Sequence, residues 1–151
     1  DGFIVGRSGI VHSLNYRSAM AFGRARLLED PAAKRAAMES FIDRLYAGRP
    51  AKLRPTTDTE LAQIALVEME IEEASAKVKA TGPTDLPADE GWTAWSGVFP
   101  VETRIGAALP QAGMGAGGPP TADLAPYADG GPLDRALSAA ARAAQGLPDS
   151  A

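Results

Sequence analysis

Hydrophobic and polar side chains alternate most clearly near the middle of the chain. Three apolar residues alternate there with three glutamates, in the order Val67, Glu68, Met69, Glu70, Ile71 and Glu72. This period of two predicts a half-buried strand with one acidic face. The glutamates suit either an acid/base or metal cluster or a face left in water. The solvated face is favoured, because three like charges on one face repel each other.

Three further strands are expected. Residues 3–11 and residues 16–28 are rich in apolar strand-forming residues, and Gly23 in the second run indicates a bulge or a close approach of two backbones. These two runs join near residues 14–15, which predicts a strand–loop–strand corner there. A last aromatic-rich strand is expected at residues 92–101, where Pro100 suits an edge or terminal position.

Two helices follow from local signals. Asp30 is a good N-cap and Pro31 suits the first helical position, so a helix is expected to begin there. Its apolar residues recur at helical spacing, at Met38, Phe41, Ile42 and Leu45. Thr57 followed by Glu60 fits a capping box, which predicts a second, short helix.

The character of the chain changes near residue 106. Gly and Pro become frequent in residues 106–151, whereas residues 136–145 are rich in alanine and favour a helix by propensity alone. We therefore expect a compact domain over residues 1–105. We expect the tail, residues 106–151, to be largely disordered, with a short helix possible at 133–145.

Composition limits the class of function. The chain has 151 residues, a net charge of −4, no cysteine and one histidine. These counts exclude disulfides and thiolate catalysis and argue against a metal centre. The acidic balance argues against a nucleic-acid partner. No apolar run approaches the roughly 18–20 residues that span a bilayer, so we expect a cytoplasmic protein without a membrane partner.

The densest polar group of the chain is the polar cluster, residues 12–18, with the sequence His-Ser-Leu-Asn-Tyr-Arg-Ser. It contains an imidazole, an amide, a phenol, a guanidinium and two hydroxyls. Polar groups at the entrance of a buried strand need partners, either within the protein or on a ligand. Arg17 is the hardest to explain as structural, because an arginine entering an apolar strand requires an anion. The polar cluster is therefore the best candidate for a binding site.

Three separated motifs resemble the flavin-nucleotide-binding branch of the pyridoxamine 5′-phosphate oxidase-like family. They are residues 12–26, residues 73–83 and residues 95–100. The resemblance covers about residues 1–105 and implies a mainly β fold with helices (α+β), an FMN-binding split β-barrel, usually a homodimer with FMN at its interface. Members of the family have strands and a helix before the point where this chain begins. We therefore expect the chain to be a C-terminal portion of such a barrel.

The resemblance also implies roles for the polar cluster. Arg17 offers donors to the FMN phosphate or to a ring oxygen, and Ser18 contacts the flavin or its ribityl chain. Asn15 and Tyr16 shape the corner, and His12 contacts the cofactor or a substrate. Structural alternatives stay open, since Tyr16 also suits the core, Asn15 a turn and His12 a satisfied structural histidine.

Three residues outside the polar cluster belong to the same expected site. Ser75 and Lys77 match the family's Ser-Ala-Lys motif. Lys77 either approaches the cofactor or a substrate anion, or pairs with a nearby glutamate. Trp95 either closes over the isoalloxazine ring or lies in the core, and the core is the commoner place for such an aromatic residue.

The leading hypothesis is an FMN-dependent oxidoreductase that acts on a small-molecule substrate, with the redox chemistry carried by the flavin. Whether the chain is an enzyme is left open, and no catalytic residue is assigned. One alternative is a flavin-binding module without turnover. Another is an incomplete domain with a structural or interaction role.

Overall fold

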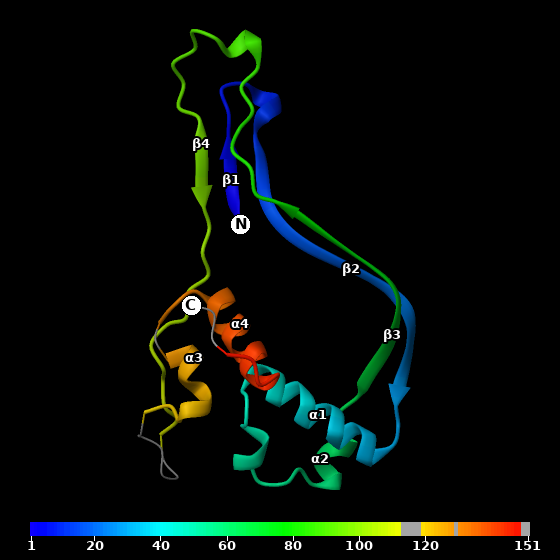
Figure 1. Cartoon of the computed structure of the whole chain (residues 1–151). Helices are drawn as coiled ribbons and strands as arrows, with labels where there is room; N and C mark the ends of the chain where they lie inside the picture. Colours follow the sequence, from blue (N-terminus) through cyan, green and yellow to red (C-terminus); the bar gives the residue numbers. More distant parts are fainter. Residues whose placement is uncertain (113–118, 129, 149–151) are drawn as a thin grey trace. The chain divides into compact units, whose positions relative to one another are not determined.

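The structure is a computed structural model that describes residues 1–112, 119–128 and 130–148. Four strands form one sheet in the order β3-β2-β1-β4 (Figure 1). Their bounds are Gly2–Val5 for β1, Ser13–Leu28 for β2, Leu66–Lys79 for β3 and Gly97–Pro100 for β4. β1 pairs antiparallel with both β2 and β4, so that Phe3 lies opposite Leu14 on one side and Phe99 on the other. The sheet is open, and the α+β class expected of a partial split β-barrel is confirmed.

The corner between the first two strands lies earlier in the chain than predicted. β1 ends at Val5 and a short 3-10 helix occupies Gly9–Val11, whereas β2 begins at Ser13. Most of the polar cluster therefore lies within a paired strand, and only His12 lies at the corner. The last strand is also shorter than predicted, because the segment from Trp92 to Ser96 is outside β4.

Contacts divide the chain into two compact units. Unit 1 comprises residues 1–25 and 69–102, and unit 2 comprises residues 26–68 and 103–151. Each unit therefore draws on two separate stretches of sequence. The polar cluster and the other expected site residues all belong to unit 1.

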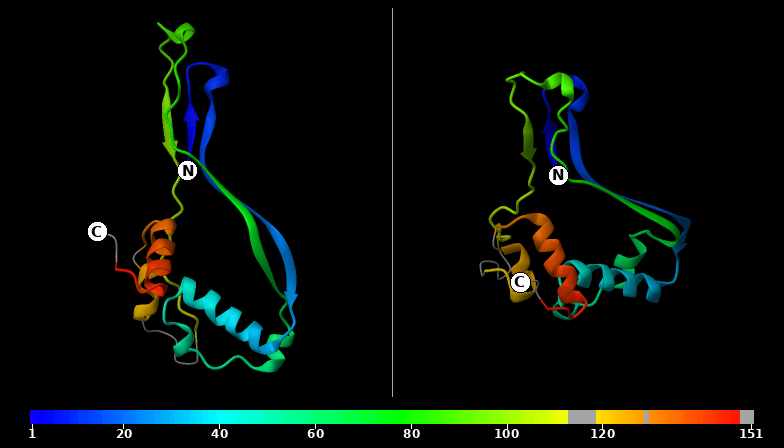
Figure 2. Two further views of the ribbon diagram at one scale, coloured as in Figure 1. Left: turned by 45° about the vertical axis from the view of Figure 1, so that its right-hand side comes forward. Right: turned by 45° about the horizontal axis from the view of Figure 1, so that its top comes forward.

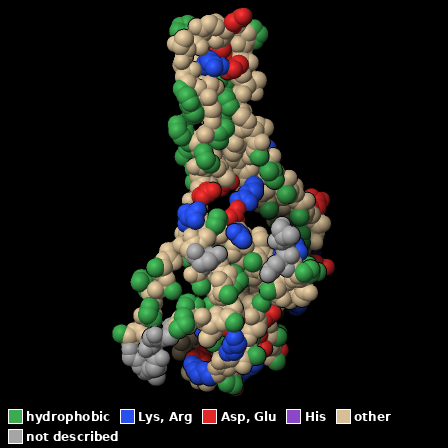
Figure 3. All heavy atoms as spheres, turned by 60° about the vertical axis from the view of Figure 1, so that its left-hand side comes forward, with side chains coloured by type: hydrophobic (Ala, Val, Ile, Leu, Met, Phe, Trp, Pro, Cys, Tyr) green, Lys and Arg blue, Asp and Glu red, His purple; other side chains and the backbone are tan. Residues whose placement is uncertain are grey.

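Unit 1 buries little of its apolar surface. Ile4, at 3% exposure, is the one large hydrophobic side chain that is fully buried among the described residues of this unit. Hydrophobic side chains instead lie open along the strands (Figure 3). The exposed ones include Phe3, Leu14, Met20, Phe22, Met69, Ile71, Val78, Trp95 and Phe99. Contiguous apolar surface of this extent is typical of a face that another element covers.

The α-helices of the described residues all lie in unit 2. They are α1 (Pro31–Leu45), α2 (Asp58–Ala62), α3 (Ala125–Ala128) and α4 (Leu133–Ala144). The Ala33 amide donates to the Asp30 carboxylate over 2.8 Å, which caps α1 as the sequence predicts. The predicted capping box of α2 is present as well, since Thr57 and Glu60 exchange hydrogen bonds. Hydrogen bonds from Arg54 and Thr57 lower the pKa of Glu60 to about 2.

α4 lies where the alanine-rich stretch predicts a helix. It packs against α1 (Figure 2), and Ala136 and Ala140, one turn apart, are its buried residues. The start of α4 is tied to residues 103–105, because the Leu133 N–H donates to the Thr103 carbonyl over 2.8 Å. A short alanine-rich helix is marginal in water, so docking against α1 supplies the burial that its sequence lacks.

Gly23 in β2 marks a close approach, one of the two alternatives that the sequence predicts. A Cβ placed on this residue would lie 1.9 Å from the carbonyl oxygen of Glu70 in β3. A side chain there would clash with the backbone of β3. Because the clashing atom belongs to the backbone, no change of side-chain rotamer can relieve the clash.

We expect Gly23→Ala to destabilise the protein by about 1–3 kcal/mol, because the added methyl group overpacks the contact between β2 and β3. Urea unfolding measures the loss. Gly9→Ala is the matched control, since nothing lies within 4 Å of the Cβ position at Gly9. Equal stability of the two variants would contradict the close approach.

Candidate functional site

Asn15 fastens β2 to the segment that follows β3. Its amide nitrogen donates to the Thr81 carbonyl over 2.9 Å, and its amide oxygen accepts from the Thr81 backbone N–H over 3.0 Å. The Asn15 side chain thus exchanges two hydrogen bonds with the backbone of Thr81, as two paired residues of an antiparallel sheet do. The Asn15 side chain is therefore engaged with backbone and holds the neighbouring residues of β2 in place.

Two lysines of β3 reach side chains of the polar cluster. The Lys79 ammonium donates to the Ser13 hydroxyl over 2.6 Å. The Lys77 ammonium lies 5.6 Å from the centre of the Tyr16 ring, within cation–π range. The hydrogen bond to Tyr16 raises the pKa of Lys77, so this side chain stays protonated at neutral pH. Unit 1 thus places two ammonium groups beside the polar cluster.

Arg17 presents its guanidinium to the surface of unit 1. Its side chain is 60% exposed, and its Nε lies 3.9 Å from an Asp1 carboxylate oxygen. An exposed ion pair at this distance contributes little to stability. The guanidinium that the resemblance assigns to the flavin thus lies at the surface, beside an acidic residue.

His12 is oriented by a backbone group. Its Nδ1 lies 3.0 Å from the Ser8 carbonyl oxygen. Because a carbonyl can only accept, this contact places the ring proton on Nδ1 and leaves the lone pair on Nε2. The imidazole is exposed, so Nε2 is the nitrogen that a ligand would meet.

Two serine hydroxyls near the corner are buried without a partner. Ser8 follows β1, and Ser96 directly precedes Gly97, which pairs with Val5. Among the described residues neither hydroxyl oxygen has a hydrogen-bond partner. Buried polar atoms are nearly always satisfied, so both are consistent with a polar ligand group near the corner.

The expected site residues fall into two groups. Tyr16, Lys77 and Ser75 lie on β2 and β3 at one side of the sheet. Trp95 precedes β4, the opposite edge strand, where its ring packs on Phe99 with centroids 4.8 Å apart. At 57% exposure it is not a core residue in this chain. Ser18 is exposed on β2 and makes no contact that assigns it a role.

Sequence reasoning missed Lys79 and Ser8. Lys77 and Lys79 are two residues apart and therefore share a strand face, a signal that points to both lysines together. Ser8 had no such signal, because its burial depends on the fold of the corner.

Two glutamates of β3 form ion pairs with arginines of β2. In unit 1, Arg24 Nε lies 3.4 Å from a Glu72 carboxylate oxygen. In unit 2, Arg26 pairs with Glu68. No group of metal-binding side chains occurs in the part of the chain that the structure describes. These contacts pair the glutamates with arginines. The apolar residues Val67 and Ile71 are exposed as well, so β3 is not half-buried in this chain as the alternation predicts.

The open sheet with a polar cluster on β2 defines part of a split β-barrel, and the comparisons with known proteins specify the family. The family model described as pyridoxamine 5′-phosphate oxidase matches residues 1–78, more than half of the chain. The chain therefore belongs to the pyridoxamine 5′-phosphate oxidase family. No curated protein sequence matches it significantly.

Two solved structures are similar over most of the chain. The flavocytochrome Anf3 from Azotobacter vinelandii is 31% identical, with a TM-score of 0.76 and 84% of this chain covered. The FAD and heme binding protein from Mycobacterium smegmatis is 34% identical, with a TM-score of 0.75 and 88% covered. The chain spans 59% and 64% of the length of these two relatives.

Across the described ranges, no helix has the length and apolar character needed to cross a membrane.

We expect Asn15→Ala to speed hydrogen exchange at the Thr81 amide and to destabilise the protein by about 1–3 kcal/mol, because both bonds to Thr81 are lost. Amide exchange measured by NMR tests the first effect directly. Ser18→Ala, on the same strand, is the control and should leave the Thr81 amide unchanged. An unaltered exchange rate at the Thr81 amide in Asn15→Ala would show that Asn15 does not hold the segment after β3.

Proposed function

We propose that this chain belongs to a flavin-binding protein and supplies one wall of the flavin site, with FMN as the flavin. The observation that carries the proposal is that unit 1 brings three cationic side chains to β2 and β3, namely Arg17 within the polar cluster and Lys77 and Lys79 beside it. Membership of the pyridoxamine 5′-phosphate oxidase family supports it, as do two relatives described as a flavocytochrome and as an FAD and heme binding protein.

In this proposal each side chain has a physical task. The exposed guanidinium of Arg17 binds the flavin phosphate, since its planar fork matches an oxyanion. Lys77, protonated and held at Tyr16, adds a second positive charge. Ser18 and Ser75 offer hydroxyls to the ribityl chain or the ring. FMN and FAD share the ring, the ribityl chain and the first phosphate, so these residues serve either flavin.

We further propose an oxidoreductase acting on a small-molecule substrate. When bound, a flavin supplies hydride or electron transfer, and the protein supplies binding, orientation and electrostatics. A non-catalytic flavin-binding module is the alternative. Reduction of the bound flavin by NAD(P)H, with transfer to an added acceptor, separates the two. A cytoplasmic location stays a prediction.

A homodimer is the assembly that we propose. The exposed apolar residues of unit 1, among them Phe22 and Met69, need cover. Trp95 and Lys77 lie toward opposite edges of the sheet. A second copy that packs on this face would cover the apolar residues and complete the site.

A second candidate function is heme binding. Both relatives are described as heme or flavocytochrome proteins. The specific observation in this chain is His12, its one histidine. Its Nδ1 is held by the Ser8 carbonyl and its Nε2 carries the lone pair, which is the usual arrangement of a histidine that ligates a metal. We propose that His12 would hold a heme through its Nε2.

The flavin site is tested by the affinity of the purified protein for FMN, followed by the quenching of flavin fluorescence. We expect Arg17→Ala to weaken binding by about 1.5–3 kcal/mol, because a charge-assisted bond to the phosphate is lost. Arg24→Ala is the matched control, since Arg24 lies on the same strand and pairs with Glu72 instead. The same FMN affinity in Arg17→Ala and the unmodified protein would contradict the proposal.

The heme site is tested by titration with hemin and visible absorption spectroscopy. We expect the unmodified protein to give the spectrum of a histidine-ligated heme, and His12→Ala to lose it, because the axial nitrogen is gone. Added imidazole should restore the spectrum in His12→Ala. Identical hemin spectra of the two proteins would exclude His12 as the ligand, and far-ultraviolet circular dichroism shows whether the variant is folded.

A further inference from the structure

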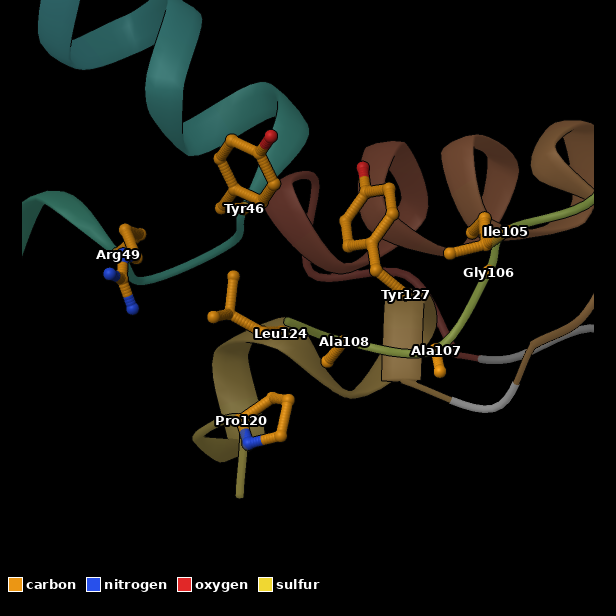
Figure 4. Close-up of a pocket in the computed structure, with 9 residues that line it drawn as sticks. All are labelled: Tyr46, Arg49, Ile105, Gly106, Ala107, Ala108, Pro120, Leu124 and Tyr127. Atoms are coloured by element: carbon orange, nitrogen blue, oxygen red, sulfur yellow. The ribbon is translucent and has the colours of Figure 1, made fainter. Parts of the chain in front are cut away.

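A pocket in unit 2 lies outside the proposed flavin site. Its volume is about 610 Å³, within the usual range for small-molecule sites. The residues that shape it most are Tyr46, Arg49, Ile105, Pro120, Leu124 and Tyr127 (Figure 4). They come from the end of α1, from the segment after β4 and from the region of α3. All of them belong to unit 2.

Two tyrosine rings form one wall of this pocket. The centroids of Tyr46 and Tyr127 are 5.2 Å apart and their planes are tilted by 56°. The Tyr127 hydroxyl donates to the Leu45 carbonyl over 2.6 Å, which fixes the ring. Burial raises the pKa of Tyr127. Figure 4 shows the two rings side by side, with Leu124 and Ala108 below them in this view. Such a wall suits a planar aromatic ligand.

The positive charge of the pocket comes from Arg49. Its Nη1 donates to Asp123 over 3.1 Å and lies 3.5 Å from the Thr121 hydroxyl. The Asp123 side chain is 2% exposed and also accepts from the Lys52 ammonium over 2.6 Å. Two cations thus face one carboxylate, whose pKa these hydrogen bonds lower, and the group carries a net charge of about +1 at neutral pH.

Arg49 has donors left for a ligand. A guanidinium has five N–H groups, and within the described residues both hydrogen bonds of Arg49 come from Nη1. The N–H groups on Nη2 and Nε are not engaged by these residues. Among the residues that line the pocket in the described part of the chain, Arg49 is the charged one.

We infer that this pocket binds a small aromatic carboxylate, with the ring against Tyr46 and Tyr127 and the carboxylate on Arg49. The apolar walls exclude a strongly hydrated ligand, and the surplus positive charge selects an anion over a neutral molecule of the same shape. The site is separate in sequence and in residues from the flavin proposal and does not depend on it.

The test is calorimetric titration of the purified protein with 2-naphthoate and with its neutral analogue 2-naphthylmethanol. We expect 2-naphthoate to bind at least about tenfold more tightly, since a hydrogen bond to a charged group is worth that factor or more. In Arg49→Gln the two compounds should bind equally, because the charge that distinguishes them is gone. That loss of discrimination reports on the ligand and not on folding.

Two further variants keep the proposal falsifiable. Ala108→Phe fills the pocket but leaves Arg49, Lys52 and Asp123 intact, and it should abolish binding of both compounds. Arg54→Gln removes an exposed arginine of the same unit that pairs with Glu60, and it should leave the affinity unchanged. Equal binding of the two compounds to the unmodified protein, unchanged binding in Ala108→Phe, or no binding of 2-naphthoate would each overturn the proposal.

Discussion

The pairing of β1 with two partners is the interaction on which unit 1 depends. This strand of four residues bonds to β2 on one side and to β4 on the other, and it carries the buried Ile4. Its position between the two strands separates the polar cluster of β2 from Trp95. A strand this short buries little, so the same pairing leaves a large apolar surface on the sheet. The need to cover that surface links the fold to the proposed assembly.

The parts of the fold that were predicted from the sequence are those with local causes. Asp30 caps α1 and the pair Thr57 and Glu60 caps α2, because each cap needs only residues three positions apart. The acidic face of β3 follows from the alternation of apolar residues with glutamates. The close approach of β2 and β3 follows from the lack of a side chain at Gly23. The open antiparallel sheet followed from the resemblance of separated motifs to a family, and periodicity alone does not specify it.

The parts that were missed have long-range causes. The polar cluster lies in β2 and not at a corner, because β1 pairs from Gly2 and draws Ser13 and Asn15 into the ladder. Contacts between residues 103–105 and 131–133 hold the start of α4, and no local pattern reveals them. The expectation of a largely disordered tail stays a prediction. Lys79 was missed as a neighbour of Ser13 because the pairing of β2 with β3 sets that contact.

In the proposed assembly, this chain contributes one wall of a flavin site that a second copy completes. Cationic groups lie on β2 and β3, and the exposed Trp95 lies near the opposite edge of the sheet. This separation fits a flavin site that two chains share. The most direct measurement is analytical ultracentrifugation of the FMN-loaded protein, followed at a wavelength where only the flavin absorbs. The account predicts that the flavin sediments with a species of twice the mass of one protein molecule. Flavin that sediments with the monomer, or a dimer that carries none, would contradict it.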